Sequence, residues 1–492
     1  NAGGEPIRMR PASGEVIAMT GSSGAAIRLF DYGPIFLLRH CLRDLHLDRH
    51  LPELFPETEA AMVIALAFNR LIRPATMPYI DTWYAETALA LDNPALSLSN
   101  REIGELLKKI GTSDIPDILA DLIIEENETR RALVYDITSL SGSSSPDHGY
   151  SQDSLLLPPI TLSLVVDEDR GIPVMYDIYP GSITDSTTLA GTLARLEACG
   201  VTDCTAILES GFFSSDNLLD MLDEQISFVI AARFSMKELR ALITREQRDI
   251  ARAGYIQEFH GRTIHIKPVV FALEGRALQG YLYYDPGLEQ EAREALTRHL
   301  DDIREALFAV RLKPGQIADH VFSGIAGEFG GFFDCKQVED RIEATIRQSA
   351  VTLRTNRMGR YMLFYQGNVD WMTCLSRYRE RDCIEEEFER LKGELEALPL
   401  EAHGTAAFHG YLFIVFLSLM LRSRLARMLE EAGLAETYSV EGVMLELEKW
   451  KKIVLADGRV TTTRMTRKQK TILKALGLVP LPREAKEKGR PR

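Results

Sequence analysis

Four polar side chains recur along one predicted helix in the segment 378–399, at Tyr378, Arg381, Glu385 and Lys392. At 100° per residue they fall within an arc of about 60°, beside an apolar stripe between residues 384 and 398 that would pack the helix. A carboxylate flanked by cations suits chemistry on a phosphate, because cations position phosphate oxygens. A solvated face with an Arg381–Glu385 pair, worth a few tenths of a kcal/mol, remains the alternative interpretation.

Two further acids, Asp136 and Glu209, are predicted at the ends of strands 131–139 and 204–210. Chemistry collects at strand ends in open α/β sheets, although either acid alone could simply cap a turn. Carboxylate oxygens are the ligands that Mg²⁺ and Mn²⁺ prefer, and two ions about 3.5–4 Å apart serve phosphoryl transfer. Asp136, Glu209 and Glu385 are therefore the candidate metal ligands and catalytic residues.

The elements that would position these acids follow the order β-β-β-α-β-α-β. A strand at 131–139 precedes a hairpin at 160–181, whose two strands are joined by a polar turn. Helices at 185–200 and 214–225 then alternate with strands at 204–210 and 226–232. This order predicts an α/β fold with an RNase H-like mixed sheet as its core.

The rest of the chain divides into regions around that core. We expect a flexible N-terminus (1–30), an all-helical N-terminal domain (31–130), a core from 131–235 and 351–430, a β-rich insertion (236–350) and a basic C-terminal region (431–492). The segment 99–111 predicts a capped helix, either for DNA recognition or for packing. The apolar run 411–421 is too short to span a bilayer and predicts a buried helix, and Gly-rich 327–334 predicts a loop.

Charge is uneven along the 492 residues, whose formal net charge is −14. An acidic balance counts against a nucleic-acid partner. Residues 451–492, however, hold 13 Lys or Arg and 3 Asp or Glu, which is +10 and leaves −24 for the rest (−14 − 10). The C-terminal segment is therefore either an electrostatic footprint for DNA or a solvated tail. Six scattered cysteines without a CxxC pair predict a reducing, cytoplasmic compartment.

The spacing Y-x2-R-x3-E-x6-K at residues 378–392 resembles the signature of bacterial insertion-sequence transposases of the cut-and-paste type with a DDE core. The segments YDITSLS (135–141), YPGSITDSTTL (179–189), ILESGFFSSDNL (207–218) and LRTN (353–356) are also similar to blocks of that family, and they occur in the same order. The interruption at 236–350 lies where such transposases carry an insertion. The resemblance extends over nearly the whole chain.

The resemblance implies roles for the six residues named above. Asp136, Glu209 and Glu385 would bind two Mg²⁺ or Mn²⁺ ions, Arg381 and Lys392 would contact DNA phosphates, and Tyr378 would meet the transposon-end backbone or a flipped base. It also implies double-stranded DNA partners (terminal inverted repeats and target DNA), a homodimer in a synaptic complex, no membrane, and action at the nucleoid in a bacterial or archaeal cytoplasm.

One position departs from the family pattern, because the second acid is Glu209 where the family has Asp. Its carboxylate would stand about 1.5 Å farther out, and an error of about 1 Å can cost on the order of 10²-fold in rate. Three functions therefore remain open: a DNA transposase that cleaves and transfers strands, a catalytically impaired transposase-derived DNA-binding protein, and a general RNase H-like nuclease.

Overall fold

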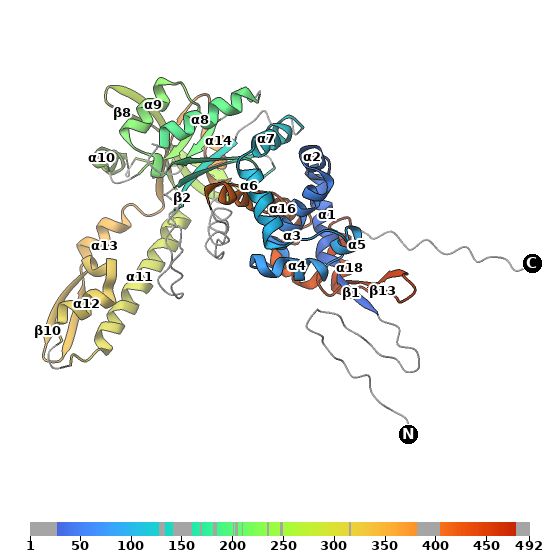
Figure 1. Ribbon diagram of the computed structural model, residues 1–492. Coiled ribbons are helices and arrows are strands. Elements are labelled where there is room, and N and C mark those ends of the chain that lie inside the picture. The colour runs from blue at the N-terminus through green and yellow to red at the C-terminus, as the bar shows by residue number, and fades with distance from the viewer. Residues whose placement is uncertain are drawn as a thin grey trace, which may run out of the picture. The chain divides into compact units, whose positions relative to one another are not determined.

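The computed structural model of the protein (Figure 1) describes residues 27–126, 133–140, 160–167, 170–180, 185–199, 201, 205–208, 210–233, 236–246, 249–313, 316–380 and 404–478. The chain forms two compact units, Asn1–Cys204 with Asp382–Arg492 (unit 1) and Thr205–Arg381 (unit 2). The predicted domain boundaries differ from this division and remain predictions.

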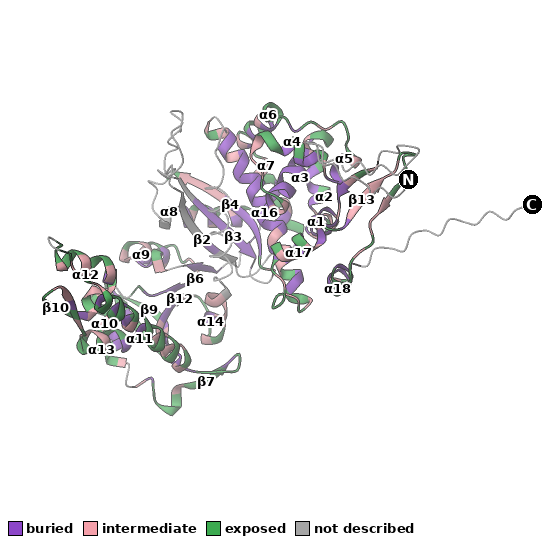
Figure 2. Ribbon diagram, turned by 90° about the horizontal axis from the view of Figure 1, so that it is seen from below, coloured by how far each residue is buried: buried purple, intermediate pink, exposed green. Residues whose placement is uncertain are grey.

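Unit 1 is built largely of helices. These helices are α1 (Gly33–Asp44), α2 (Leu47–Leu54), α3 (Glu57–Ile72), α4 (Met77–Ala85), α5 (Leu89–Asp92), α6 (Asn100–Gly111), α7 (Ile115–Glu126), α8 (Asp185–Ala198), α16 (Thr405–Glu431), α17 (Val440–Leu447) and α18 (Arg467–Ala475). The long helix α16 contacts α1, α3, α6 and α17. It is buried at every residue of 411–421 (Figure 2), which confirms the predicted core helix. Its apolar residues face neighbours on all sides, as expected of a helix that is hydrophobic all round.

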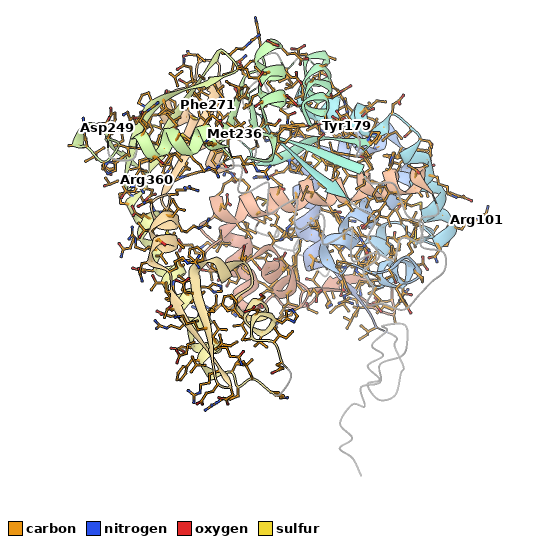
Figure 3. The ribbon with its side chains drawn as sticks, turned by 90° about the vertical axis from the view of Figure 1, so that its left-hand side faces the viewer. Arg101, Tyr179, Met236, Asp249, Phe271 and Arg360 are labelled. Atoms are coloured by element: carbon orange, nitrogen blue, oxygen red, sulfur yellow. The ribbon has the colours of Figure 1, made fainter. Side chains whose placement is uncertain are left out.

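Helix α6 packs against α16 at two glycines. A Cβ atom on Gly410 would lie 1.9 Å from the carbonyl oxygen of Leu107, and one on Gly111 would lie 1.8 Å from that of Ala406. Ser99 and Glu102 form the predicted capping box at the start of the helix. Arg101 projects outward from α6 (Figure 3). The packing interpretation of segment 99–111 therefore agrees with its buried face.

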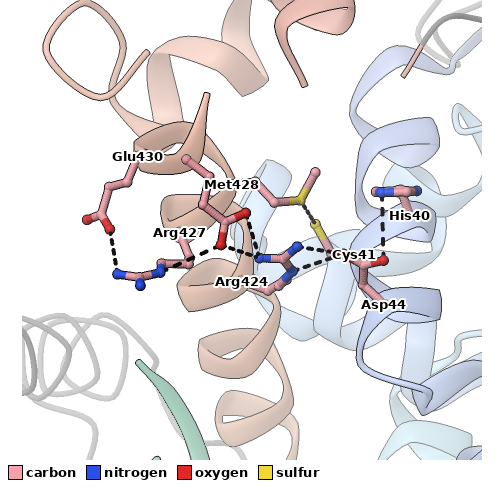
Figure 4. A network of polar contacts seen from close by, with 8 residues as sticks. His40, Cys41, Asp44, Arg424, Arg427, Met428 and Glu430 are labelled. Carbon is pink, nitrogen blue, oxygen red and sulfur yellow. Dashed lines mark hydrogen bonds and ion pairs between the residues drawn. The ribbon is translucent and has the colours of Figure 1, made fainter. Parts of the chain in front are cut away.

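Polar contacts tie α16 to α1 near the ends of both helices (Figure 4). Arg424 donates from Nε to Oδ2 of Asp44 over 2.9 Å, and its Nη1 lies 3.5 Å from Oε1 of Glu431. Cys41 Sγ lies 3.8 Å from Met428 Sδ, and burial raises the pKa of the Cys41 thiol to about 12. A thiol in this protonated state is a packing group rather than a nucleophile.

Unit 1 also contains two antiparallel sheets. Strand β13 (Lys451–Val454) lies between β1 (Arg28–Asp31) and β14 (Val460–Thr462). Strand β3 (Ile160–Asp167) pairs with both β2 (Leu133–Leu140) and β4 (Ile172–Pro180). The β3–β4 pair confirms the predicted hairpin, whose turn includes Gly171 at φ +62°.

Unit 2 contains a mixed sheet of six strands. Its order is β5 (Ala206–Leu208), β6 (Phe228–Ala231), β12 (Arg360–Gln366), β9 (Arg276–Tyr284), β8 (Arg262–Leu273) and β7 (Ile256–Phe259). Only β5 and β6 pair in parallel, and helices α9 (Ser215–Asp223), α10 (Lys237–Glu246) and α14 (Trp371–Glu380) belong to the same unit. The predicted order β-β-β-α-β-α-β is confirmed through β6.

The segment predicted as an insertion has two parts. Strands β7, β8 and β9 continue the sheet of β6 through β12, because β12 pairs with both β6 and β9. A second core lies among α11 (Pro286–Ala309), α12 (Ala318–Ala326), η3 (Gly327–Phe332), β10 (Phe333–Val338), β11 (Arg341–Ile346) and α13 (Gln348–Thr355). Residues 327–334 form a 3₁₀ turn and a strand rather than the predicted loop, because their phenylalanines pack into that core.

Within the described ranges, no single helix is long and apolar enough to cross a membrane. Helices α3 and α4, which are bent by 96° at their junction, meet that criterion only as a pair, and by length and composition alone.

Candidate functional site

Asp136 lies in the middle of strand β2, where it pairs with Leu164 of β3. The prediction that Asp136 ends its strand is wrong, because the β-branched residues Ile137 and Thr138 continue the ladder as far as Leu140. Eight consecutive register pairs therefore fix the backbone on which Asp136 is carried. The carboxylate of Asp136 lies outside the described part of the chain.

The preceding residue, Tyr135, anchors β2 to helix α8. Its side chain is 2% exposed, and its hydroxyl donates to Thr188 Oγ1 over 3.3 Å. Burial raises the pKa of the Tyr135 hydroxyl, so the group stays protonated and remains a hydrogen-bond donor. This contact restrains the strand that carries Asp136 without placing an ionised group beside it.

A polar network between β4 and α8 restrains the three-stranded sheet of β2, β3 and β4. Asp177 accepts a hydrogen bond from Thr192 over 2.9 Å and pairs with Arg195, while Tyr179 (Figure 3) lies 3.0 Å from Thr192 Oγ1. Arg195 also pairs with Asp117 of α7 over 2.7 Å. These contacts join a helix of the N-terminal region to the sheet, so Asp177 and Arg195 are supporting residues that the sequence reasoning did not single out.

Glu209 lies outside the described residues, between the last residue of β5 and the first of η1 (Ser210–Phe212). Its two flanks are well defined. Strand β5 is buried and parallel to β6, and Ser214 caps α9 by accepting a hydrogen bond at Oγ from the Asn217 amide over 3.2 Å. The predicted strand 204–210 is thus shorter than expected, with three residues in the ladder.

Tyr378 is the one signature residue with a described side chain, and it lies on α14. It is partly buried and packs against the aromatic and aliphatic cluster that fills one face of the unit 2 sheet. The neighbouring residue, Arg377, donates a hydrogen bond from Nη1 to Oγ1 of Thr205 over 3.1 Å. Thr205 is the residue directly before β5. Arg381, Glu385 and Lys392 lie outside the described residues, so the predicted arc of four polar side chains stays a prediction.

Tyrosines on β9 and β12 hold the start of α14. Tyr283 donates to the Trp371 carbonyl over 2.9 Å, and its ring stacks on Tyr361 with centroids 5.1 Å apart. The ring of Tyr281 stacks on that of Tyr365, with ring centroids 5.2 Å apart. Burial raises the pKa of Tyr281 and Tyr283, so both hydroxyls remain protonated donors. The helix that leads into the signature segment therefore begins from a rigid platform.

A buried carboxylate, Asp285, lies where the sheet of unit 2 meets α11. Its Oδ1 caps α11 by accepting from the amides of Gly287 and Leu288 over 2.9 and 3.1 Å. Its Oδ2 has no hydrogen-bond partner among the described residues and lies 3.9 Å from Arg379 of α14 and 3.8 Å from Arg262. The sequence Asp-Pro-Gly at 285–287 is the signal of a capped helix start that could have identified it.

No group of three His, Cys, Asp or Glu side chains that could hold a metal ion occurs within the described ranges. The cysteines Cys41, Cys199, Cys335 and Cys374 are free, and burial raises the pKa of Cys374 to about 12. The proposed ligands remain Asp136, Glu209 and Glu385, whose donors are all carboxylate oxygens, the donor type suited to Mg²⁺ or Mn²⁺.

Comparison with known proteins gave one family match. Residues 127–421 match the model of a family described as "Transposase DDE domain". No curated protein sequence matched the chain. Among solved structures, the chain is similar to piggyBac transposase in a cryo-EM synaptic complex with hairpin DNA, with 11% identity, a TM-score of 0.31, and coverage of 85% of this chain and 76% of that chain.

Proposed function

Because the chain belongs to the transposase DDE domain family, we propose that it catalyses metal-dependent strand cleavage and strand transfer at the ends of a DNA transposon. The observation that carries this proposal is the extent of the match. Residues 127–421 include all six candidate residues, from Asp136 to Lys392. The order of strands and helices through β6, which is that of an RNase H-like core, supports the same function.

Each candidate residue has a proposed role. Asp136, Glu209 and Glu385 would hold two divalent ions, whose charge, when they are bound, assists the attacking oxygen and the leaving oxygen of a phosphodiester. Arg381 and Lys392 would position the phosphate by charge-assisted hydrogen bonds.

Tyr378 is proposed to contact the DNA backbone at the transposon end. Its ring is held by the cluster on the sheet of unit 2, so the proposed contact would come from a side chain with little conformational freedom to lose. Arg377 and the platform formed by Tyr281, Tyr283, Tyr361 and Tyr365 are proposed as positioning residues for the same helix.

Double-stranded DNA is the proposed partner, as terminal inverted repeats and as target. Two transposon ends must be brought together for cut-and-paste transfer, so a homodimer is the proposed active form. Oxygen ligands in the proposed triad favour Mg²⁺ or Mn²⁺ as the physiological ion.

The test is cleavage of a duplex that carries the element's own end, in Mg²⁺ and in Mn²⁺, by the wild type and by Glu209→Asp. Cleavage confined to the end sequence by the wild type would support a transposase. Activity that appears only in Glu209→Asp would favour the catalytically impaired, DNA-binding alternative. Equal cutting of unrelated DNA would favour a general nuclease and contradict the proposal.

A further inference from the structure

The cations of strand β13 and those of helix α18, in the C-terminal part of unit 1, differ in how they are engaged. Residues 451–478 hold eight Lys or Arg and a single Asp. The cations of β13 are engaged within the fold: Lys451 pairs with Asp31, and the Lys452 ammonium lies 4.7 Å from the centre of the Tyr32 ring. Burial lowers the pKa of Lys452. These two lysines stabilise the small sheet and its neighbours, so they are structural.

The cations of α18 are arranged differently. Arg467, Lys470 and Lys474 are all exposed and have no ion pair with any described residue. At 100° per residue they fall within an arc of about 60°. The buried residues Gln469, Ile472 and Leu473 fall in a separate arc that begins about 60° away around the helix. We call these three residues the α18 stripe.

The stripe is held on a firmly anchored helix. Thr466 and Gln469 form a capping box at its start, and the Gln469 amide, fully buried, donates to the Glu446 carbonyl of α17 over 2.8 Å. Ile472 and Leu473 are buried on the same side of the helix. The three cations therefore share a fixed backbone, and a ligand would need to order only their side chains.

The placement of the stripe is unfavourable for the stability of the helix. Arg467 and Lys470 stand at i,i+3, and Lys470 and Lys474 at i,i+4, where like charges repel. The first turn contains Arg467 and Lys468 and no acid, although the helix dipole favours acids there. Stripe charges placed against these helix preferences, with no compensating contact among the described residues, are expected where the residues serve a function. The compensating group here would be a series of anions outside the chain.

We propose that the α18 stripe binds the sugar-phosphate backbone of duplex DNA as a contact that does not depend on base sequence. This inference rests on the proposed function, which makes DNA the partner. From Arg467 to Lys474 the stripe extends about 10 Å along the helix axis, which matches roughly three phosphates of one strand at 3.4 Å of duplex axis each. Lysine and arginine contacts to phosphates add affinity and orientation rather than base specificity.

The test uses the full chain and a fluorescent duplex of unrelated sequence, with anisotropy measured over a series of salt concentrations. The variant Arg467→Gln/Lys470→Gln/Lys474→Gln removes the stripe. The control variant Arg43→Gln/Lys237→Gln/Lys313→Gln removes three other exposed cations that have no ion pair among the described residues. Both variants lose the same charge and the same residue types. Circular dichroism melting checks that both remain folded.

For the stripe variant we expect the slope of log affinity against log salt to become shallower by about 3, and affinity near 0.1 M salt to fall about 10- to 100-fold. The control variant should stay within about twofold of the wild type. Equal slopes for the wild type and the stripe variant would overturn the inference, as would a wild type that binds no duplex.

Failure of this inference can be distinguished from failure of the proposed function. End cleavage by the wild type together with an unchanged salt slope in the stripe variant would remove the stripe and leave the transposase proposal intact. A shallower salt slope in the stripe variant, without any end cleavage by the wild type, would support DNA binding by the stripe and contradict the proposed catalytic function.

Discussion

Helices α6 and α18 share the features that their sequences reveal, but they differ in how their outward charges are paired and in how their inward faces pack. Each is short, each begins with a capping box, and each buries one apolar face. On α6 two of the three outward cations are paired within the fold: Arg101 Nε lies 2.9 Å from Glu105 Oε1, and Lys109 Nζ lies 2.5 Å from Glu59 Oε2. The third, Lys108, is exposed and has no ion pair among the described residues. On α18 the outward stripe has no such partners. Amphipathicity and capping therefore identify a helix, whereas the pairing of its outward charges indicates whether it is available to an anionic ligand.

The inward faces differ as strongly as the outward ones. Helix α6 meets α16 backbone to backbone at Gly111 and Gly410, whereas α18 contacts α17 through the side chains of Thr466 and Gln469. Close backbone contact tolerates no added atom, because the interior is packed at the density of an organic crystal. The comparison predicts that substitutions at the α6 interface affect stability most.

The largest expected effect is that of Gly410→Ala. The new Cβ would lie 1.9 Å from the Leu107 carbonyl oxygen, so α6 must move away from α16 or lose its register. Overpacking of this kind costs about 1–3 kcal/mol, and we expect the upper end because the obstructing atom belongs to the backbone. The free energy of unfolding, followed by urea titration, measures the effect.

Gly104→Ala is the matched control for that substitution. It lies on the same helix α6, but no described atom beyond its chain neighbours and the backbone of its own helix lies within 4 Å of the position of a new Cβ. Alanine favours a helix over glycine by up to about 1 kcal/mol, so the control should be neutral or stabilising. If both substitutions reduced stability equally, close packing of α6 on α16 would not be the reason.

A smaller effect, of opposite sign on the two helices, is expected from removing one outward cation. Lys470→Gln relieves repulsion from Arg467 and Lys474 and should raise the free energy of unfolding by about 0.4–1 kcal/mol, at 0.2–0.5 kcal/mol for each pair. Arg101→Gln breaks the pair with Glu105 and should lower stability slightly. The melting temperatures of Lys470→Gln and Arg101→Gln are compared with that of the wild type. Lys470→Arg, which keeps the charge, is the control. A stabilising Arg101→Gln would show that the two outward faces do not differ as described.

The smallest expected effect is a difference in pH dependence between the two capping boxes. Hydrogen bonds from Ser97 and Ser99 lower the pKa of Glu102 below its ordinary 4.5, whereas the equivalent residue of α18 is the neutral Gln469. A lowered folded-state pKa adds stability above the unfolded pKa, and this is lost as pH falls through the folded pKa. The stability difference between wild type and Glu102→Gln should therefore be fully present at neutral pH, begin to decline as pH falls below about 4.5, and vanish once pH is below the lowered folded-state pKa. A difference that persisted unchanged in acid would contradict the ionised cap.

Much of the fold was predictable because local signals and tertiary structure agree. The capping box at Ser99, the hairpin at 160–180 and the buried helix around 411–421 each follow from periodicity or turn chemistry. Strand ends were less predictable, since Asp136 lies within its strand and β5 keeps only Ala206–Leu208. The number of residues that pair in a strand depends on packing against the side chains of the neighbouring strand, and the sequence of one segment does not specify those neighbours.

The supporting residues of the candidate site were harder to predict. Asp177 and Arg195 act through partners that lie 15 (177 to 192) and 78 (117 to 195) residues away in sequence, so no local pattern marks them. Asp-Pro-Gly marks Asp285 as a helix cap, but its approach to Arg379 spans 94 residues (285 to 379) and has no local signal. The tyrosine platform likewise needs the register of β9 against β12, where Tyr283 pairs with Tyr361. The metal triad and the phosphate-binding cations remain predictions from sequence and from family membership.

Cleavage of a duplex bearing the element's end, by the wild type and by Glu385→Gln at equal DNA occupancy, tests the central claim most directly. The proposal predicts cleavage in Mg²⁺ that stops when the metal is chelated. It also predicts that Glu385→Gln is slower by on the order of 10²-fold or more, because loss of a metal ligand removes several kcal/mol of transition-state stabilisation. Cleavage by Glu385→Gln at the wild-type rate would contradict the assignment of the site.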